Sequence, residues 1–441
     1  MSSPQAPPVD TSVTFQSLPG DILGLILDHC PDLDTFLSCI ATCRAFYDVF
    51  QSAPKSFARN LVHRLIEPSL LPEAILVFCA RSYRTRHMSD LPLAVSQILS
   101  WRNDEQRPNF LNLWSLRQAI SALRLNAIIS TLAGELATSH LSKFEELSDH
   151  KQKLPSEQEL RRINRALYRY EIYSALLPRH AHDSDEQSQG YGAAQLAFLG
   201  RASAWENEQL VCVYEALWRR VAPAYNDLAL HDITWGCSCA TYAVELGHPG
   251  VEGLLERGLR SVFDIAHAET YARRYELIGT GALMPDSKNK FLLSAFRKYR
   301  YSVLSTPPGS AWTETVFPLD SDQGPERFWI WSHKHWLGHP EEERRMRVVA
   351  QDGHENMRNS GCVFWDEERL DDSGILGRDW VDLGASDDAI RSAAPSREDQ
   401  IETWRERMEL YMKGKRGYWP LRRERGRNDR MKCGGDQRLS A

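Results

Sequence analysis

The chain has 441 residues, 42% of them hydrophobic and 25% charged, which is typical of two or three globular domains and unlike disordered or fibrous proteins. The formal net charge of −6 argues against a globally basic nucleic-acid binder, and no uncharged apolar run of about 18 residues indicates a membrane span. Nine widely scattered cysteines do not suggest a disulfide framework, so we expect a soluble protein of the cytoplasm or nucleus with reduced thiols.

Residues 1–13 are rich in proline and polar residues and are predicted to be a flexible leader. The block that follows, residues 14–60, is predicted to form three short helices. Pro19 suits the first turn of the first helix, and the run of isoleucine and leucine after it ends at Pro31. This run places apolar groups on nearly every side of the helix, more than a helix facing water needs. Asp32 is a good N-cap for the second helix.

A helical body is predicted for residues 61–309. Apolar residues at spacings of three and four predict helices over residues 59–77, 111–136, 251–266 and 287–304. Two capping boxes predict the first turns of further helices: Ser156 with Glu159, and Ser203 with Glu206. The second of these helices is predicted to end at Pro223, and the polar segment 180–192 between the two is predicted to be a surface loop.

Tryptophan is concentrated near the carboxyl end, where eight of the 13 tryptophans follow residue 309 while helical periodicity fades. Residues 310–390 are therefore predicted to form an aromatic-rich, loop-rich layer packed on the body. Residues 391–441 are predicted to be a helix and a basic flexible tail, because residues 413–432 hold nine Lys and Arg against two acidic residues. The tail is interpreted as a docking strip, a nuclear-import address or a solvated tail with neither role. The predicted fold class is mostly α.

The block from Leu18 to Phe57 resembles an F-box. Leu18 and Pro19, an acidic residue two positions later and the apolar run match the opening of the family pattern. The capped second helix and the pair Cys43-Arg44 match its middle, and Phe46 stands where the family usually has tryptophan. Runs such as RRINRALYRYEIY and GCVFWDEERL resemble the body of fungal F-box-like proteins, a family that brings no known catalytic residues.

The resemblance implies a non-catalytic, substrate-recruiting subunit of an SCF-type ubiquitin ligase. Its F-box would bind a Skp-type adaptor carried by a cullin scaffold, and the rest of the chain would capture a protein substrate of unknown identity. The adaptor-binding residues implied are Leu18, Pro19, Ile22, Leu23, Leu33, Leu37, Cys43 and Phe46. A helical block of about 45 residues can barely support its own core, which also favours a partner surface.

Three alternatives stay open at this stage. The block is an ordinary capped helical hairpin, the chain is an F-box scaffold without a role in ubiquitylation, or it is an enzyme with a site in the carboxy-terminal region. Six aromatic residues of that region are candidates for substrate capture, although most are expected in the core: Phe328, Trp329, Trp331, Trp336, Phe364 and Trp365.

Metal-ligating residue types occur, but in spacings that fit no complete site. His333, His335 and His339 form an H-x-H-x₃-H cluster, yet Trp336 stands where a zincin needs glutamate. Cys237 and Cys239 are separated by one residue, not by the two of a zinc knuckle. We therefore predict no metal and no cofactor.

Overall fold

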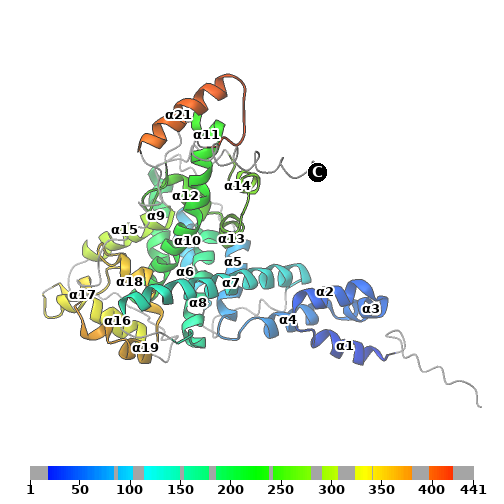
Figure 1. Cartoon of the computed structure of the whole chain (residues 1–441). Helices are drawn as coiled ribbons and strands as arrows, with labels where there is room; N and C mark the ends of the chain where they lie inside the picture. The colour runs from blue at the N-terminus through cyan, green and yellow to red at the C-terminus, as the bar shows by residue number, and fades with distance from the viewer. Residues whose placement is uncertain are drawn as a thin grey trace, which may run out of the picture. The chain divides into compact units, whose positions relative to one another are not determined.

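The computed structural model describes residues 18–83, 88–102, 114–148, 153–177, 185–237, 242–279, 291–305, 323–339, 341–379 and 397–420. Across these residues the chain forms α-helices and short 3-10 helices without a strand, so the predicted mostly-α fold is confirmed (Figure 1). The chain divides into two compact units, residues 1–78 with 101–127 and residues 79–100 with 128–441. These units do not follow the boundaries after residues 60 and 309 that the sequence suggests.

The first unit contains the three predicted short helices and a fourth that begins inside the predicted block. Its elements are α1 (Gly20–Asp28), α2 (Leu33–Thr42), α3 (Arg44–Ser52), α4 (Pro54–Leu65) and the first parts of α5 (Leu71–Ser82) and α7 (Leu116–Leu147). As predicted, Asp32 caps α2, accepting a hydrogen bond from the backbone N–H of Thr35 at 2.7 Å. Phe36, Phe50 and Phe57 form the core of this bundle, with ring centroids 6.0–6.4 Å apart.

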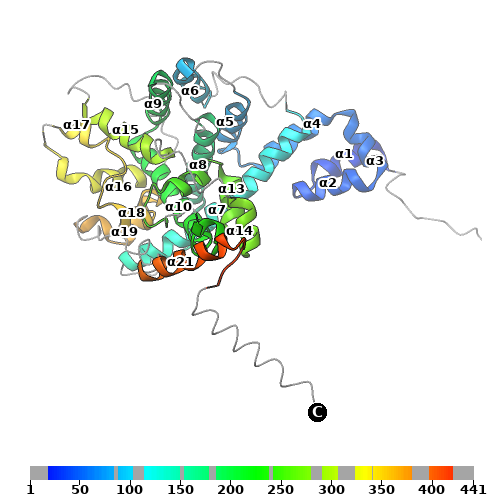
Figure 2. The same ribbon diagram turned by 90° about the horizontal axis from the view of Figure 1, so that it is seen from above.

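The second unit is built around the long helix α10 (Ala204–His231), which lies among other helices in Figure 2, and it includes the rest of α7. The helices of its amino-terminal half are α6 (Leu91–Ser100), α8 (Glu157–Leu176), α9 (Asp185–Leu199), α11 (Ile233–Cys237), α12 (Pro249–Leu255), α13 (Leu259–Ala266), α14 (Tyr271–Ile278) and α15 (Phe291–Ser305), with the 3-10 helix η2 (Met88–Asp90). The others are α16 (Gly324–Ser332), α17 (Glu342–Arg345), α18 (Glu355–Asn359), α19 (Glu367–Asp372) and α21 (Arg397–Met412), with η6 (Lys334–Trp336), η7 (Cys362–Phe364) and η8 (Ile375–Gly377).

Two predicted helices are each divided in two. The helix predicted over 59–77 is α4 and α5, because Pro68 disfavours helical backbone at the residue before it. The helix predicted over 251–266 is α12 and α13. Gly258 separates them with φ 86° and ψ 174°, a conformation that is essentially restricted to glycine.

Two helices extend where the sequence predicts none. The predicted loop 180–192 is wrong from residue 185 onward, because α9 buries Tyr191, Phe198 and Leu199 and packs on α6 and α15. Burial of this apolar end outweighs the low helix propensity of its polar start. The predicted end at Pro223 is also wrong, since α10 continues to His231. Pro223 is exposed, so water can hydrate the carbonyl that loses its helical partner.

The remaining predicted helices keep their type and change their bounds. The helix predicted over 111–136 is α7, which runs on to Leu147, and the one predicted over 287–304 is α15. By length and composition alone α7 could cross a membrane, a property that core helices of water-soluble proteins share, and 39% of its most apolar 18 residues are buried. The absence of a membrane span stays a prediction.

The predicted basic tail is anchored where it begins. The backbone N–H of Trp419 donates to the carbonyl of His231 at 2.8 Å, and that of Ile233 donates to Gly417 at 3.1 Å. The Trp419 side chain is buried. The predicted tail thus bonds to the second unit at residues 417 and 419, and residues 421–441 lie outside the described residues, as does the leader 1–13.

We predict that Gly258→Ala lowers stability by about 1–3 kcal/mol through its backbone conformation alone. An added methyl group would also lie 3.0 Å from Glu171 Oε2, which accepts the backbone N–H of Leu259 at 2.7 Å. Gly253→Ala, inside α12 with open space around it, should instead be neutral or stabilising. Urea unfolding of both variants tests this, and equal effects would contradict it.

Candidate functional site

The predicted adaptor-binding residues divide into buried and accessible positions. Leu23 and Phe46 are 3% and 4% exposed, so they belong to the core of the first unit and not to its surface, contrary to the prediction. Both lie on the inner faces of short helices whose apolar side chains fill a small core. The other six are accessible: Pro19 and Ile22 are exposed, and Leu18, Leu33, Leu37 and Cys43 are half-buried.

An apolar surface on α1, here called the α1 patch, is formed by Leu18, Pro19, Ile22 and Leu25. Ile22 and Leu25 are 43% and 54% exposed, and their spacing of three places them on neighbouring parts of one helix face. Leu25 is not among the predicted adaptor-binding residues. The apolar groups on nearly every side of the predicted helix nevertheless indicated an exposed apolar face.

The buried leucines of α1 show how the helix is oriented. Leu23 and Leu27 are buried, and Ile22 and Leu25 remain outside. Gly20 and Gly24 face α3, where a Cβ atom at either position would lie 3.7–3.8 Å from Val49. This is ordinary van der Waals contact, so the packing of α1 rests on its two leucines and not on its glycines.

The aromatic residues proposed for substrate capture are mostly core residues. Phe328, Trp329, Trp331, Phe364 and Trp365 are all buried, so they cannot form a capture surface. Trp329 donates its indole N–H to the Met346 carbonyl at 2.7 Å. Trp336 is the half-buried member of the six, and the Arg345 guanidinium lies over its ring at 4.5 Å.

The three clustered histidines do not converge on one point. His333 is buried, where its ring bonds Ser332 and the Trp329 carbonyl, and burial lowers its pKa to about 4. His335 and His339 are exposed. Among the residues with a described position, we find no group of three His, Cys, Asp or Glu side chains that could hold a metal ion.

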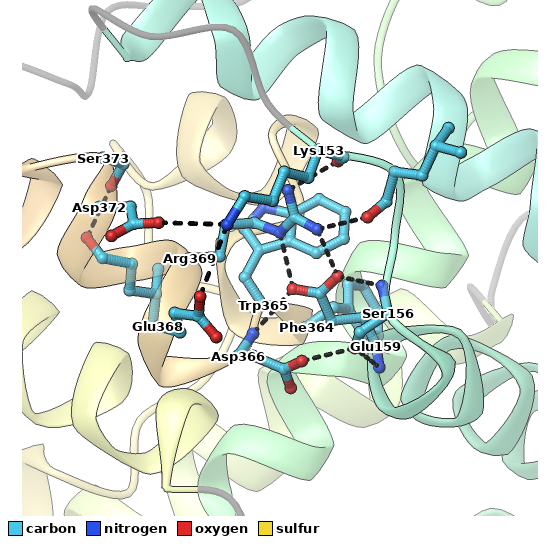
Figure 3. Close-up of polar contacts among 12 residues, drawn as sticks. Lys153, Ser156, Glu159, Phe364, Trp365, Asp366, Glu368, Arg369, Asp372 and Ser373 are labelled. Atoms are coloured by element: carbon cyan, nitrogen blue, oxygen red, sulfur yellow. Dashed lines mark hydrogen bonds and ion pairs between the residues drawn. The ribbon is translucent and has the colours of Figure 1, made fainter.

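A buried ion pair joins the amino end of α8 to α19 (Figure 3). Glu159 is fully buried, and Arg369 contacts both of its carboxylate oxygens, Nε with Oε1 at 2.7 Å and Nη2 with Oε2 at 2.8 Å. Arg369 also donates to the carbonyls of Lys153 and Leu154, each at 2.9 Å. The two residues are 210 positions apart, so this pair fixes the carboxy-terminal region on the helical body.

The capping box of α8 continues into the same network. As predicted, the Ser156 hydroxyl accepts the backbone N–H of Glu159, and the backbone N–H of Ser156 donates to the Glu159 carboxylate. The same hydroxyl donates to Asp366 at 2.5 Å. Arg162, itself buried, donates to Asp366 at 2.7 Å and to the Phe364 carbonyl at 2.8 Å. Burial nevertheless raises the pKa of Asp366. The polar groups of this network bond one another, so we interpret the network as a structural connection between α8 and the carboxy-terminal region.

A second buried cluster surrounds Arg358 on α18. Its guanidinium Nε donates to Glu215 at 2.8 Å, and Nη1 lies 3.3 Å from Glu208; both carboxylates project from α10. Glu208 also accepts the backbone N–H of Ala350 at 2.8 Å, and burial raises its pKa. All three charged residues are at least nine-tenths buried. The sequence could not indicate this cluster, because Arg358 lies 143 positions from Glu215 and 150 positions from Glu208.

No protein-family model, curated protein or solved structure matches this chain.

We predict that Arg369→Ala destabilises the second unit by about 3–5 kcal/mol, because Glu159 is left as an uncompensated buried charge. Arg327, which pairs with Glu367 and Asp371 on the exposed side of α19, provides the control. Arg327→Ala should leave the urea midpoint nearly unchanged, since exposed pairs contribute little. Similar midpoint shifts in the two variants would refute the structural role of the buried pair.

We also predict that His140 weakens the fold in acid. Its Nδ1 donates to the Asn359 carbonyl at 2.7 Å, and burial lowers its pKa from 6.5 to about 4. Below about pH 6.5 the His140 imidazole therefore binds a proton in the unfolded chain but stays neutral in the folded chain. The free energy of unfolding consequently falls as the pH drops toward 4.

His140→Asn keeps a donor near Nδ1 and removes this titration. Between about pH 7 and pH 5 the wild type should lose about 2 kcal/mol more than the variant. Urea unfolding across this range measures the difference. Parallel pH profiles of the two proteins would show that His140 is not the responsible group.

Proposed function

We propose that this chain is an F-box substrate-recruiting subunit of an SCF-type ubiquitin ligase. It would bind a Skp-type adaptor through the first unit and a protein substrate through the second. The observation that carries the proposal is the α1 patch, because exposed apolar residues gathered on one helix face are typical of protein docking surfaces. It lies on the helix whose Leu18-Pro19 start resembles the F-box pattern.

The packing of the first unit supports the same proposal. The interior of the bundle is filled by Phe36, Phe50 and Phe57, so Ile22 and Leu25 are not needed for its core. Tyr47 on α3 is likewise 48% exposed. Burial of an isoleucine or leucine side chain contributes about 1.5–3 kcal/mol, so a partner covering this patch gains a substantial binding energy.

Three of the described cysteines are unsuited to covalent catalysis. A ligase that carries ubiquitin as a thioester needs an accessible thiolate. Cys79, Cys212 and Cys362 are buried, and burial raises the pKa of each thiol, that of Cys79 to about 12, whereas Cys39, Cys43 and Cys237 are half-buried. The chain would act by holding its substrate close to the ubiquitin carrier, which raises the effective concentration of the target lysine.

We predict that the double variant Ile22→Ala, Leu25→Ala binds a purified Skp-type adaptor about 100-fold more weakly than the wild type, since each truncation removes apolar surface worth about 1.4 kcal/mol. Both side chains are exposed, so the thermal unfolding curve should not change. Leu93→Ala on α6, a leucine that is 76% exposed in the second unit, is the matched control and should bind normally. Titration by calorimetry decides, and equal affinity of wild type and double variant would reject the F-box assignment.

A further inference from the structure

The second unit contains a pocket of about 740 Å³. It is lined by residues of α10 and α15 and by the segment that leads into α18. The half-buried Leu246, Leu293 and Leu304 supply apolar surface, and Tyr301, 72% exposed, stands at the rim. The volume lies within the usual range of ligand sites and exceeds the space that a single side chain fills.

Arg358 presents an unused hydrogen-bond donor to this pocket. Its Nε donates to Glu215, and its Nη1 donates to the Gln351 carbonyl at 2.9 Å and lies near Glu208. Nη2 has no acceptor among the described residues, since its nearest charged partner, Glu355 Oε1, is 3.8 Å away. Nη2 is not among the buried atoms without a partner, so this donor is accessible and can donate to an acceptor bound in the pocket.

The charges around Arg358 indicate which acceptor fits. Glu208, Glu215 and Glu355 already place three carboxylates around one guanidinium. A further anion would add to this negative charge, whereas a neutral carbonyl oxygen can accept from Nη2 without a charge of its own. The apolar surface beside it suits an aliphatic or aromatic side chain.

The backbone at the pocket is strained. Ala350 lines the pocket and has φ 53°, the one positive φ of a non-glycine residue within the described part of the chain. Glu208 holds this conformation by accepting the Ala350 N–H at 2.8 Å. Such strain persists only where the surroundings impose it, and it is concentrated at binding sites.

We propose that this pocket binds an extended segment of a protein substrate, which inserts an apolar side chain and offers a backbone carbonyl to Arg358. The inference rests on the proposed function, since it assigns that substrate a binding site. A polypeptide is favoured over a small amide because the rim also carries exposed groups of both signs, Arg297 and Glu245, where flanking residues would pass.

The test uses the full chain and fluorescein-labelled heptapeptides of glycine and serine whose central residue is Leu, Ser or Asp. In fluorescence anisotropy the Leu peptide should bind at least tenfold more tightly than the Ser peptide, in line with the burial of one leucine, and the Asp peptide no more tightly than the Ser peptide. N-acetyl-leucine methylamide should compete weakly.

Three variants locate the binding. Leu293→Trp fills the pocket, Arg358→Lys keeps a cation among the carboxylates but lacks Nη2, and Tyr301→Ala removes an exposed rim residue that the core does not need. Each should weaken the Leu peptide about tenfold or more, whereas Leu154→Ala, at an 88% exposed position outside the pocket lining, should not.

Equal affinity for the Leu and Ser peptides, or normal binding by a folded Leu293→Trp protein, would overturn the proposal. If the small amide competes as strongly as the unlabelled Leu peptide, the ligand is a small molecule and not a polypeptide. That result would also overturn the proposal. A chain that binds the adaptor but not the Leu peptide rejects this pocket and keeps the proposed function. A chain that binds the peptide but not the adaptor rejects the proposed function alone.

Discussion

Helix α10 carries carboxylates into the interior of the second unit, and the arrangement around it depends on neutralising them. Glu208 and Glu215 are nearly inaccessible, and both contact the single guanidinium of Arg358. A buried charge without a partner is strongly destabilising, so the segment containing Arg358 cannot be an optional layer on the body. The requirement explains why short, irregular helices with little helical periodicity nevertheless hold fixed positions.

The joint between Glu159 and Arg369 applies the same principle at the start of α8. Buried ion pairs contribute less to net stability than to the choice of which surfaces pair, because desolvation offsets much of their attraction. Two such pairs on neighbouring helices, α8 and α10, set the position of the carboxy-terminal region. The Arg358 cluster also shapes the pocket, since Arg358, Glu215 and Ala350 line it and Glu208 bonds the Ala350 N–H. The charged cluster of Arg358, Glu208 and Glu215 thus holds the fold together and also forms part of the proposed substrate site.

Local rules predicted what local interactions determine. The break at Pro31, the cap at Asp32 and both capping boxes are present with the expected bonds. The same rules failed where tertiary packing decides, as at α9 and Pro223. They could not locate the ion pairs, whose partners are 143 to 210 positions apart. For α1, the apolar run indicated an exposed apolar face, but only the packing of Leu23 and Leu27 separates its outward residues from its core.

Because the carboxy-terminal region is held by side-chain contacts, its attachment does not depend on an unbroken chain. A single proteolytic cut between residues 305 and 323 would leave both buried ion pairs and the aromatic core intact. The two fragments would then migrate together in native chromatography and separate only in denaturant. A preparation cut at that position would therefore look intact by size exclusion although a denaturing gel shows two pieces, a property that matters when preparations of this protein are judged for integrity.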